Sequence, residues 1–329
     1  MKSLSFEQIR ALTKGALTVS QTECGVTFDR YTPAQKDFYA ATETDFFNKA
    51  HASAGVCLDM TTDAWCFQVD FTVNPKSQSR FFCYFDLYVN DKPFLHHGWD
   101  NTQGTAQTLQ ADLPIGKKRL TLWLPTVFET RIGDLRINDE ANVEAVEADR
   151  TLLCIGDSIT HGYDAMYPSC TYPALIGRYA GWNVINQGIA GDRFHPGNLG
   201  QGIGFAPDAI TLLLGTNDWA NRSREQFLQN TQEYFALLGQ LYPHTPITVI
   251  TPLWRGDWER TTAVGSFDFA RARVRDMAQT LPNATVLEGW ELMPHKKSLF
   301  SPDALHPNDL GFQTLFGALL PHLKGLFRQ

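Results

Sequence analysis

The stretch Thr151-Leu-Leu-Cys-Ile-Gly-Asp-Ser158 is an apolar run that ends abruptly in Gly-Asp-Ser. A short, continuous apolar run bounded by turn residues is typical of a strand that is buried on both faces of a parallel sheet. The chain turns at the carboxyl end of such a strand, and this is the edge where open α/β sheets form their ligand crevices. Ser158 is therefore predicted to lie at the functional edge of an α/β domain.

The residues that follow continue the same pattern. Apolar runs recur at 209–214, 246–251 and 284–288, and longer helical patterns alternate with them. Buried strands that alternate with helices predict a parallel sheet covered by helices on both faces, which is a three-layer α/β fold. The expected helices span about residues 168–180, 222–241, 267–280 and 308–325.

The first half of the chain has a different pattern. From about Gly15 to Ile137, short segments with alternating apolar and polar residues are separated by turn residues. This alternation predicts an antiparallel β-sandwich, in which each strand turns one face to the partner sheet. The first twenty residues fit either a strand or a short helix. The acidic stretch Asn138–Arg150 is predicted to be a linker, so the expected domains are residues 1–145 and 146–329.

Composition excludes several classes of protein. The 329 residues are 43% hydrophobic and 19% charged, as in ordinary globular proteins, and the chain is longer than most single domains. The net charge of −7, without a basic cluster, argues against a nucleic-acid partner. No segment suits a membrane helix, and Glu7 and Arg10 interrupt the place where the core of a signal peptide would lie. We expect a cytoplasmic protein and leave a homo-oligomer open.

Six cysteines are scattered along the chain without a Cys-x-x-Cys pair. This spacing favours individually buried thiols over a disulfide framework or a zinc site. The chain also has no His-Glu-x-x-His motif and no dense group of histidines and carboxylates in sequence, so we expect neither a metal nor another cofactor. The cysteines are Cys24, Cys57, Cys66, Cys83, Cys154 and Cys170.

Four short motifs in the second half fit together as one hydrolytic site. Gly156–Ile159 supplies a serine hydroxyl, and Asp303–Pro307 supplies a histidine and a carboxylate. Asn186–Asp192 and Gly215–Asp218 supply a glycine amide and an asparagine side chain that can meet an oxyanion. Acyl transfer needs a nucleophile, a base and preorganised donors of this kind. Gly-Asp-Ser alone also fits a turn with a helix N-cap, but the four motifs together are a specific signal.

Asp303 and His306 offer the base that the serine needs. A serine hydroxyl is too weakly acidic to attack an ester unless a base takes its proton. Three residues apart on a turn, the carboxylate can hold one imidazole nitrogen and leave the other for Ser158. The alternative is a Pro-flanked turn with an exposed histidine.

Three other histidines compete for the role of the base. Asp192 and His195 have the same spacing, but Arg193 between them is expected to neutralise the carboxylate. His161 lies only three residues beyond the serine on the same turn, which constrains it poorly as a base, and His295 has no carboxylate at that spacing. Sequence alone excludes none of them.

Two residues are candidates for the oxyanion site beside the backbone N–H of Ser158. Gly191 can bring its N–H close because it has no side chain, and Asn217, predicted to end the strand at 210–214, can direct its amide to the same point. Taken singly, each also fits an ordinary turn residue. Taken with the serine and the histidine, they fit an oxyanion hole.

The four motifs resemble the conserved blocks of the SGNH (GDSL-type) hydrolases over about residues 150–329. The first motif departs from the shorthand name only by Ile in place of Leu, a common variant. The resemblance implies a triad of Ser158, His306 and Asp303. It also implies that Ser158, Gly191 and Asn217 form the oxyanion hole, without a metal or another cofactor.

The first half is similar to the β-sandwich (jelly-roll) domain that precedes this catalytic domain in some carbohydrate acetylesterases and acyltransferases. This second resemblance is looser, and Phe85–Tyr88 is its best local match. The resemblance implies a two-domain protein that acts on small-molecule esters. His96–Trp99 could add to the cleft from this half, although an exposed loop is the alternative.

Trp219, Trp254 and Arg255 are candidate substrate-binding residues. They follow predicted strand ends near the proposed site, where indoles can stack on sugar rings and a guanidinium can bind hydroxyls. The alternative is structural: the tryptophans cover the sheet edge, and Arg255 pairs with Asp257 or Glu259.

The sequence supports one main functional hypothesis and two rivals. The main hypothesis is a serine esterase that removes acetyl or similar short acyl groups from carbohydrates. The first rival is an acyltransferase with the same nucleophile, in which an alcohol replaces water. The second is a catalytically inactive carbohydrate-binding protein, and the intact Ser158, Asp303 and His306 argue against it.

Overall fold

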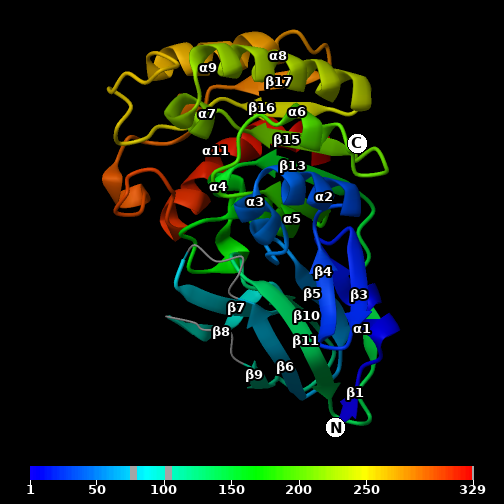
Figure 1. Cartoon of the computed structure of the whole chain (residues 1–329). Coiled ribbons are helices and arrows are strands. Elements are labelled where there is room, and N and C mark those ends of the chain that lie inside the picture. Colours follow the sequence, from blue (N-terminus) through cyan, green and yellow to red (C-terminus); the bar gives the residue numbers. More distant parts are fainter. Residues whose placement is uncertain (75–79, 101–105, 328–329) are drawn as a thin grey trace.

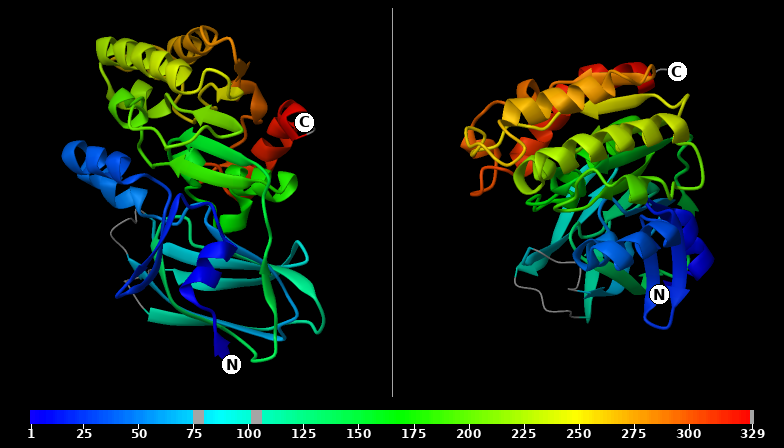
Figure 2. Two further views of the ribbon diagram at one scale, coloured as in Figure 1. Left: turned by 90° about the vertical axis from the view of Figure 1, so that its right-hand side faces the viewer. Right: turned by 45° about the horizontal axis from the view of Figure 1, so that its top comes forward.

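The computed structural model describes residues 1–74, 80–100 and 106–327. The first half consists mainly of antiparallel sheets, and the second half is a parallel sheet with helices around it (Figure 1). Figure 2 shows the same two halves of the molecule from two further sides. The predicted fold class, an α/β domain preceded by antiparallel β-structure, is confirmed.

Two antiparallel sheets form the first half. One has the order β3-β4-β11-β6-β9, with β1 beside β11, and the other has the order β12-β5-β10-β7-β8, with β2 beside β5. The first contains β1 (Lys2–Ser3), β3 (Thr18–Thr22), β4 (Gly25–Asp29), β6 (Cys66–Asn74), β9 (Ala106–Asp112) and β11 (Glu129–Ile137). The second contains β2 (Thr13–Lys14), β5 (Cys57–Thr62), β7 (Phe82–Val89), β8 (Lys92–Asp100), β10 (Lys118–Trp123) and β12 (Val143–Ala145).

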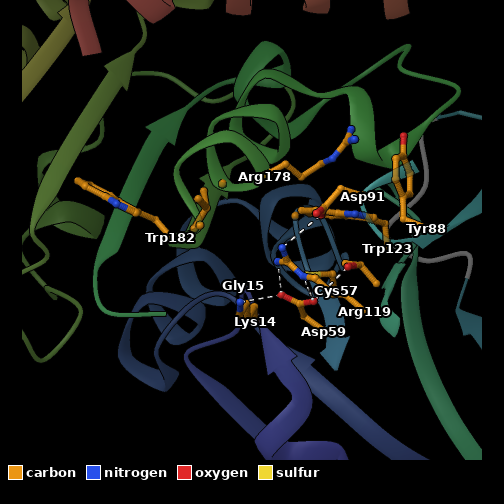
Figure 3. A pocket seen from close by; sticks show the side chains of 15 residues that line it. Lys14, Gly15, Cys57, Asp59, Tyr88, Asp91, Arg119, Trp123, Arg178 and Trp182 are labelled. Carbon is orange, nitrogen blue, oxygen red and sulfur yellow. Dashed lines mark hydrogen bonds and ion pairs between the residues drawn. The ribbon is translucent and has the colours of Figure 1, made fainter. Parts of the chain in front are cut away.

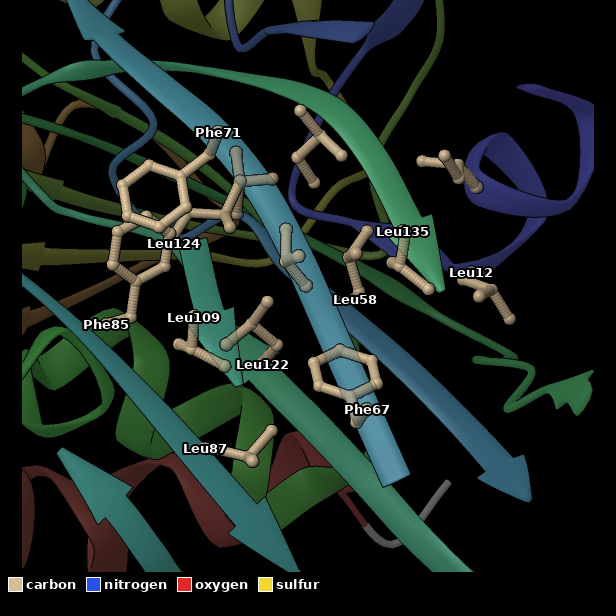
Figure 4. Close-up of a cluster of buried hydrophobic side chains, with 14 of the residues drawn as sticks. Leu12, Leu58, Phe67, Phe71, Phe85, Leu87, Leu109, Leu122, Leu124 and Leu135 are labelled. Carbon is tan, nitrogen blue, oxygen red and sulfur yellow. The ribbon is translucent and has the colours of Figure 1, made fainter. Parts of the chain in front are cut away.

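The core of this half lies between the two sheets (Figure 4). Along β6, Phe67, Val69 and Phe71 are buried, while the residues between them face outward. Leu122 and Phe85 enter the same core from the other sheet. Burying each such side chain contributes about 1.5–3 kcal/mol, so the alternating pattern provides the driving force for the sandwich.

Two helices interrupt the region that the sequence predicts as strands, α2 (Pro33–Thr42) and α3 (Thr44–Ala50). A further helix, α1 (Phe6–Leu12), precedes that region. Thr32 caps α2 by accepting from the Gln35 backbone N–H, and Pro33 occupies the first turn, where no N–H is needed. These residues also suit a turn between strands, which is why the prediction for this segment is wrong. The first twenty residues contain both of the predicted alternatives, since short strands flank α1.

The second half contains a parallel sheet of order β14-β13-β15-β16-β17. Its strands are β13 (Thr151–Gly156), β14 (Asn183–Gly188), β15 (Ala209–Leu213), β16 (Ile247–Ile250) and β17 (Ala284–Leu287). The helical elements are α4 (Ser158–His161), η2 (Pro168–Cys170), α5 (Tyr172–Ala180), α6 (Pro196–Leu199), α7 (Thr216–Asn221), α8 (Arg224–Leu241), α9 (Phe267–Ala278), α10 (Gly289–Leu292), η3 (Lys297–Leu299) and α11 (Asp309–Phe327).

Helices cover both faces of this sheet, as predicted. Leu153 and Ile155 of β13 belong to the same buried cluster as side chains of α8 and α9. Leu152 and Cys154 point to the other face and belong to a cluster with side chains of α5 and α11. Since neighbouring residues of one strand enter different cores, the continuous apolar run at 151–155 is explained.

Two details differ from the prediction. The sequence analysis does not predict strand β14, because the polar residues of Asn183–Gly188 interrupt the apolar run that is typical of a buried strand. The predicted linker Asn138–Arg150 includes β12, which pairs with β5. The boundary between residues 145 and 146 stays a prediction; β12 ends at Ala145 and β13 begins at Thr151.

A narrow cavity lies between the two halves, beside β5, β10 and α5 (Figure 3). Asp59 is buried at its wall and binds Lys14 and Arg119 at 2.7 Å each. The space open to water is about 30 Å³, which suits one or two water molecules and excludes a substrate. This cavity is therefore part of the joint between the halves.

The cysteines and the helices bear on two further predictions. All six cysteines are free, and four of them are buried, but Cys24 is exposed, so the prediction of buried thiols is wrong there. Burial raises the pKa of Cys83 above its ordinary value.

Among the described residues, no helix combines the length and the apolar character that crossing a bilayer requires.

Candidate active site

Ser158 lies where the chain leaves β13, the strand between β14 and β15 in the parallel sheet. Strand β13 ends at Gly156, and Asp157 caps the short helix α4 by accepting from the Ile159 N–H at 2.9 Å. Burial raises the pKa of Asp157 to about 7. A side chain on Gly156 would collide with Thr160 and with the backbone of Leu213, so the tight turn requires glycine. The serine is thereby fixed at the predicted edge of the sheet.

His306 and Asp303 meet Ser158 from the carboxyl-terminal end of the chain. His306 Nε2 lies 2.8 Å from Ser158 Oγ, and His306 Nδ1 lies 2.6 Å from Asp303 Oδ2. A proton on Nδ1, donated to the carboxylate, leaves Nε2 free to accept the serine proton. The predicted proximity of these three side chains is found in the structure.

Asp303 is held in its ionised form. Burial raises the pKa of this carboxyl, but the hydrogen bonds from the His306 side chain and from the backbone N–H groups of Leu305 and His306 outweigh it and hold the pKa well below its usual value. Between these residues, Ala304 has a φ of +53°, in the left-handed region. Such a conformation is costly for a residue other than glycine, and it allows the turn to bring the carboxylate back to the imidazole.

A hydrogen bond ties Asn217 to Asp192, the residue that follows Gly191. Gly191 has a φ of +90° in a turn closed by the Asp192 N–H and the Ile189 carbonyl. Asn217 Nδ2 donates to the backbone carbonyl of Asp192 at 3.0 Å. An amide nitrogen carries two hydrogens, so one remains available for a ligand. Asn217 lies in the first turn of α7 and does not end a strand, because β15 stops at Leu213.

The competing histidines occupy other environments. His161 is fully buried and bonded to the Thr126 carbonyl, and burial lowers its pKa well below the ordinary value. His295 Nε2 lies 2.8 Å from the Trp290 carbonyl.

The rival pair of Asp192 and His195 lacks the protonation states that a base held by a carboxylate needs. His195 Nε2 lies 3.7 Å from Asp192, and burial lowers the pKa of His195 to about 4. Arg193 pairs with Glu43 of the first half, so the expectation that it neutralises Asp192 is wrong. Burial keeps Asp192 protonated instead, by raising its pKa to about 8.

The candidate substrate-binding residues are mainly structural. Trp219 is 0% exposed, donates to the Gly265 carbonyl and has the guanidinium groups of Arg255 and Arg260 over its ring. An indole without an exposed face cannot stack on a sugar, so this expectation does not fit the structure. Arg255 is nearly buried and pairs with Asp257, the structural alternative given above.

Trp254 does not meet the expectation for a ligand residue either, whereas His96 lines a groove between the two halves. Trp254 is 7% exposed and packs against His295 and Phe300. His96 lies in strand β8, where a loop was the expected alternative, and it binds the buried Asp86 at 2.7 Å.

Two residues at the site escape the sequence analysis. Arg80 comes from the segment before β7, in the first half, and Asp164 follows α4. Asp164, Asp303 and His306 have ligand atoms within 4.8 Å of one another, a group that folding forms although the sequence shows no dense cluster of histidines and carboxylates. Arg80 already supplies a cation there, and we do not assign these residues to a metal. No local motif marks either residue, because their role depends on packing between the halves.

A serine hydroxyl beside an imidazole that a carboxylate holds is the arrangement that a hydrolase-type site requires, and here it lies at the carboxyl edge of an α/β sheet. Residues 154–314 match the family model described as the GDSL-like lipase/acylhydrolase family. The protein is thus a carboxylic ester hydrolase by class. A sequence search finds no match among curated proteins.

Solved structures with the same fold cover both halves of the chain. The salicylyl-acyltransferase SsfX3 from a tetracycline biosynthetic pathway has a TM-score of 0.81 at 22% identity, covering 95% of this chain and 94% of its own. A protein from Bacteroides ovatus described as a GDSL-like lipase has a TM-score of 0.80 at 18% identity, covering 99% and 98%. The acetyl xylan esterase Est2A from the rumen bacterium Butyrivibrio proteoclasticus has a TM-score of 0.66 at 13% identity, covering 100% and 99%. At these identities the likeness shows the fold.

Proposed function

We propose that this protein is a serine esterase that hydrolyses short-chain O-acyl esters, above all acetyl esters of carbohydrates. The contact of 2.8 Å between Ser158 Oγ and His306 Nε2 is the observation that carries the proposal. It lies within the range in which a base can take the proton of a nucleophile.

In the proposed reaction, Ser158 attacks the ester carbonyl while His306 takes the hydroxyl proton at Nε2. Asp303 holds the imidazole by Nδ1 and stabilises the imidazolium. The imidazolium then protonates the leaving alcohol, which gives an acyl-enzyme. Water, deprotonated by the same histidine, releases the carboxylic acid and restores the serine.

The negative charge of the tetrahedral intermediate needs donors fixed in advance. We propose the backbone N–H groups of Ser158 and Gly191 and the second amide hydrogen of Asn217. The bond from Asn217 to the Asp192 carbonyl supports this assignment, because it ties the asparagine to the turn that carries Gly191. Donors that need not reorganise contribute most to the stabilisation of a developing oxyanion.

The groove between the two halves is where we propose the carbohydrate binds. It has a volume of about 780 Å³ and is lined from both halves, with Phe94 and Tyr167 among its exposed aromatic side chains. Asp309, three residues after the base, accepts from the Tyr167 N–H at 3.1 Å and so links the groove to the catalytic turn. The acetyl xylan esterase and the family two carbohydrate esterase from Cellvibrio japonicus share this fold, which supports the substrate class.

The test of the esterase function is the Ser158→Ala variant with p-nitrophenyl acetate. Turnover is expected to fall by about 10⁴-fold or more, since the reaction loses its covalent route. Ser298→Ala, an exposed serine of the same half, is the control and should keep its activity. Near-normal hydrolysis by a folded Ser158→Ala protein would overturn the proposal.

The test of the substrate class is Tyr167→Ala. We expect KM for acetylated xylo-oligosaccharides to rise, while hydrolysis of p-nitrophenyl acetate stays within about threefold of the unchanged protein, because the small ester does not reach the groove. Equal effects on both substrates would contradict binding of the carbohydrate in the groove.

An acyltransferase with the same nucleophile is the second candidate, supported by the shared fold of the salicylyl-acyltransferase. Both reactions pass through one acyl-enzyme and differ in the acceptor. Added sugar alcohols should leave the ratio of acetate to transferred acetyl high if the protein is an esterase. Transfer that exceeds hydrolysis at millimolar acceptor would favour the acyltransferase.

An inactive carbohydrate-binding protein is the third candidate. A fluorophosphonate probe distinguishes it, because such a probe reacts only with an activated serine. Labelling of Ser158 is expected, and a folded protein that resists the probe would favour the binding function.

We also propose that the protein works in the cytoplasm. The six free cysteines support this, since paired cysteines are the usual device of proteins in oxidising compartments.

A further inference from the structure

A guanidinium from the first half of the chain reaches the proposed catalytic residues. Arg80 Nη2 lies 3.4 Å from His306 Nδ1 and 3.7 Å from Asp303 Oδ2. Its carbon Cζ lies 4.8 Å from the centre of the Tyr163 ring. The second half supplies all three proposed triad residues, so this is a direct contact of the β-sandwich with the reaction centre.

Arg80 holds a second carboxylate beside the histidine. Its Nε and Nη2 donate to the two oxygens of Asp164 at 2.5 and 3.1 Å, a bidentate pair. Asp164 Oδ2 lies 3.6 Å from His306 Nδ1. Asp164 has a φ of +65°, a conformation that is uncommon outside glycine. With this backbone conformation its carboxylate meets the guanidinium of Arg80.

The imidazole of His306 thus lies among charges of both signs. The carboxylates are Asp303 on its own turn and Asp164 on the segment after β13, and Arg80 is the cation. The same segment places Tyr163 near the ring and the acid Asp157, whose pKa burial raises to about 7, within electrostatic reach. Arg80 and Asp164 are shielded from water, with 28% and 13% of their side chains exposed. Charges within about 4 Å and partly shielded act strongly on the protonation of a neighbour.

We propose that Arg80 and Asp164 form a pair of positioning residues that sets the protonation of the catalytic base, with the β-sandwich supplying the cation. The inference rests on the proposed function of Ser158 and His306. Asp164 favours the imidazolium that forms in the transition state. Arg80 opposes this effect, because its guanidinium disfavours a positive charge on the neighbouring imidazole.

Opposite effects follow for the two residues. Without Arg80, two carboxylates near Nδ1 stabilise the imidazolium, so the base stays protonated, and inactive, up to a higher pH. Without Asp164, the guanidinium disfavours the imidazolium, so the base remains available at a lower pH but the transition state loses stabilisation. A purely structural role would not move the two variants in opposite directions.

The experiment compares Arg80→Gln, Asp164→Asn and the double variant by the pH dependence of kcat/KM for p-nitrophenyl acetate. We expect the acid limb to move up by about 0.5–1 pH unit in Arg80→Gln and down by a similar amount in Asp164→Asn. The double variant should lie near the unchanged protein. Asp164→Asn should also lower kcat at the plateau about tenfold.

Two controls keep the test specific. Arg131→Gln removes an arginine of the same sandwich that is 31% exposed and paired with Glu129, and it should leave the acid limb in place. Arg80→Lys keeps the charge and should keep the limb within about 0.3 pH unit, although it loses the bidentate geometry. Circular dichroism shows whether each variant is folded.

An NMR titration of the His306 imidazole in the Ser158→Ala background repeats the comparison without catalysis. Opposite shifts of the titration midpoint in the Arg80 and Asp164 variants support the inference. Shifts in the same direction, or no shifts in folded variants, overturn it while the esterase function stands. If the Ser158→Ala protein itself remains active, the proposed function fails separately.

Discussion

The two halves of the molecule differ in what they bring to the candidate site. The α/β half supplies the proposed nucleophile, base and oxyanion donors, all at the carboxyl edge of its sheet. The β-sandwich half supplies cations whose side chains cross into the other half: Arg30, Lys49 and Arg80. The proposed reaction therefore uses residues that follow strand ends of the α/β half. We infer that long basic side chains from the β-sandwich half help to hold these residues in position.

Arg30 offers the most severe test of this dependence. It is fully buried and donates to the carbonyls of Lys49 and Ala52 in its own half and of Asn186 and Gly188 on β14. Burial lowers its pKa to about 10, so it stays charged at neutral pH. The guanidinium therefore replaces water for four backbone acceptors at once.

Arg30→Met should lower the free energy of unfolding by about 3–5 kcal/mol, because several buried carbonyls lose their donor. Chemical denaturation measures this. Arg10→Met, at an exposed arginine paired with Glu7, should stay within about 0.5 kcal/mol. Equal stability of the two variants would show that the halves do not depend on this contact.

Asn217→Ala tests the α/β half alone. We expect kcat to fall by about 10²–10³-fold while the fold persists, because one oxyanion donor is lost. Asn221→Ala, at an exposed residue of the same helix, is the matched control. A loss below threefold at Asn217 would remove this residue from the proposed oxyanion hole.

Sequence reasoning succeeds where the chemistry is local. The apolar run before Ser158, and the spacing from Asp303 to His306, each fix a strand end or a turn by short-range rules, and the structure brings these residues together. Helices α8, α9 and α11 follow from periodic patterns of the chain. Strand β14 fails the same reasoning, because polar residues such as Asn186 face partners that only the folded chain supplies.

Sequence reasoning fails where one half completes the other. Arg80 has no motif around it. Its contact with His306 joins residues that are 226 positions apart in the sequence, so local patterns do not predict it. Trp219 shows the opposite error: an aromatic residue after a predicted strand end suggests a ligand surface, but packing covers the ring completely. Burial and long-range contact are properties of the whole fold, which local spacing does not encode.

Lys49→Met tests whether the β-sandwich half also supports the turn that carries Gly191, one of the proposed oxyanion donors. Lys49 Nζ donates to the Ala190 carbonyl at 3.1 Å, next to Gly191, and pairs with the exposed Asp45. Methionine keeps the apolar stem but removes the donor, so kcat/KM should fall about tenfold with little change in unfolding. Asp45→Asn removes only the exposed partner and should have almost no effect. Equal kinetics for the two variants would contradict support of the turn by Lys49.

The smallest expected effect concerns the buried acid beside the same turn. Burial raises the pKa of Asp192 to about 8, although the Arg193 N–H and the Tyr39 hydroxyl bond to it. A group with a raised pKa in the folded state stabilises the protein at low pH, and this contribution is lost as the pH rises from about 4 to 8. Asp192→Asn keeps the neutral shape and the hydrogen-bonding groups without the ionisation.

The variant should therefore gain stability relative to the unchanged protein between pH 7 and pH 8, by about 1 kcal/mol, because one pKa unit corresponds to about 1.4 kcal/mol and the dependence weakens near the pKa of about 8. Denaturation at the two pH values measures this difference. The exposed Asp112→Asn is the control and should show none. If Asp192→Asn instead loses stability as the pH rises, the carboxylate is ionised in the fold. The turn that carries Gly191 would then depend on a negative charge, held by the Arg193 backbone N–H and by the Tyr39 hydroxyl from the first half.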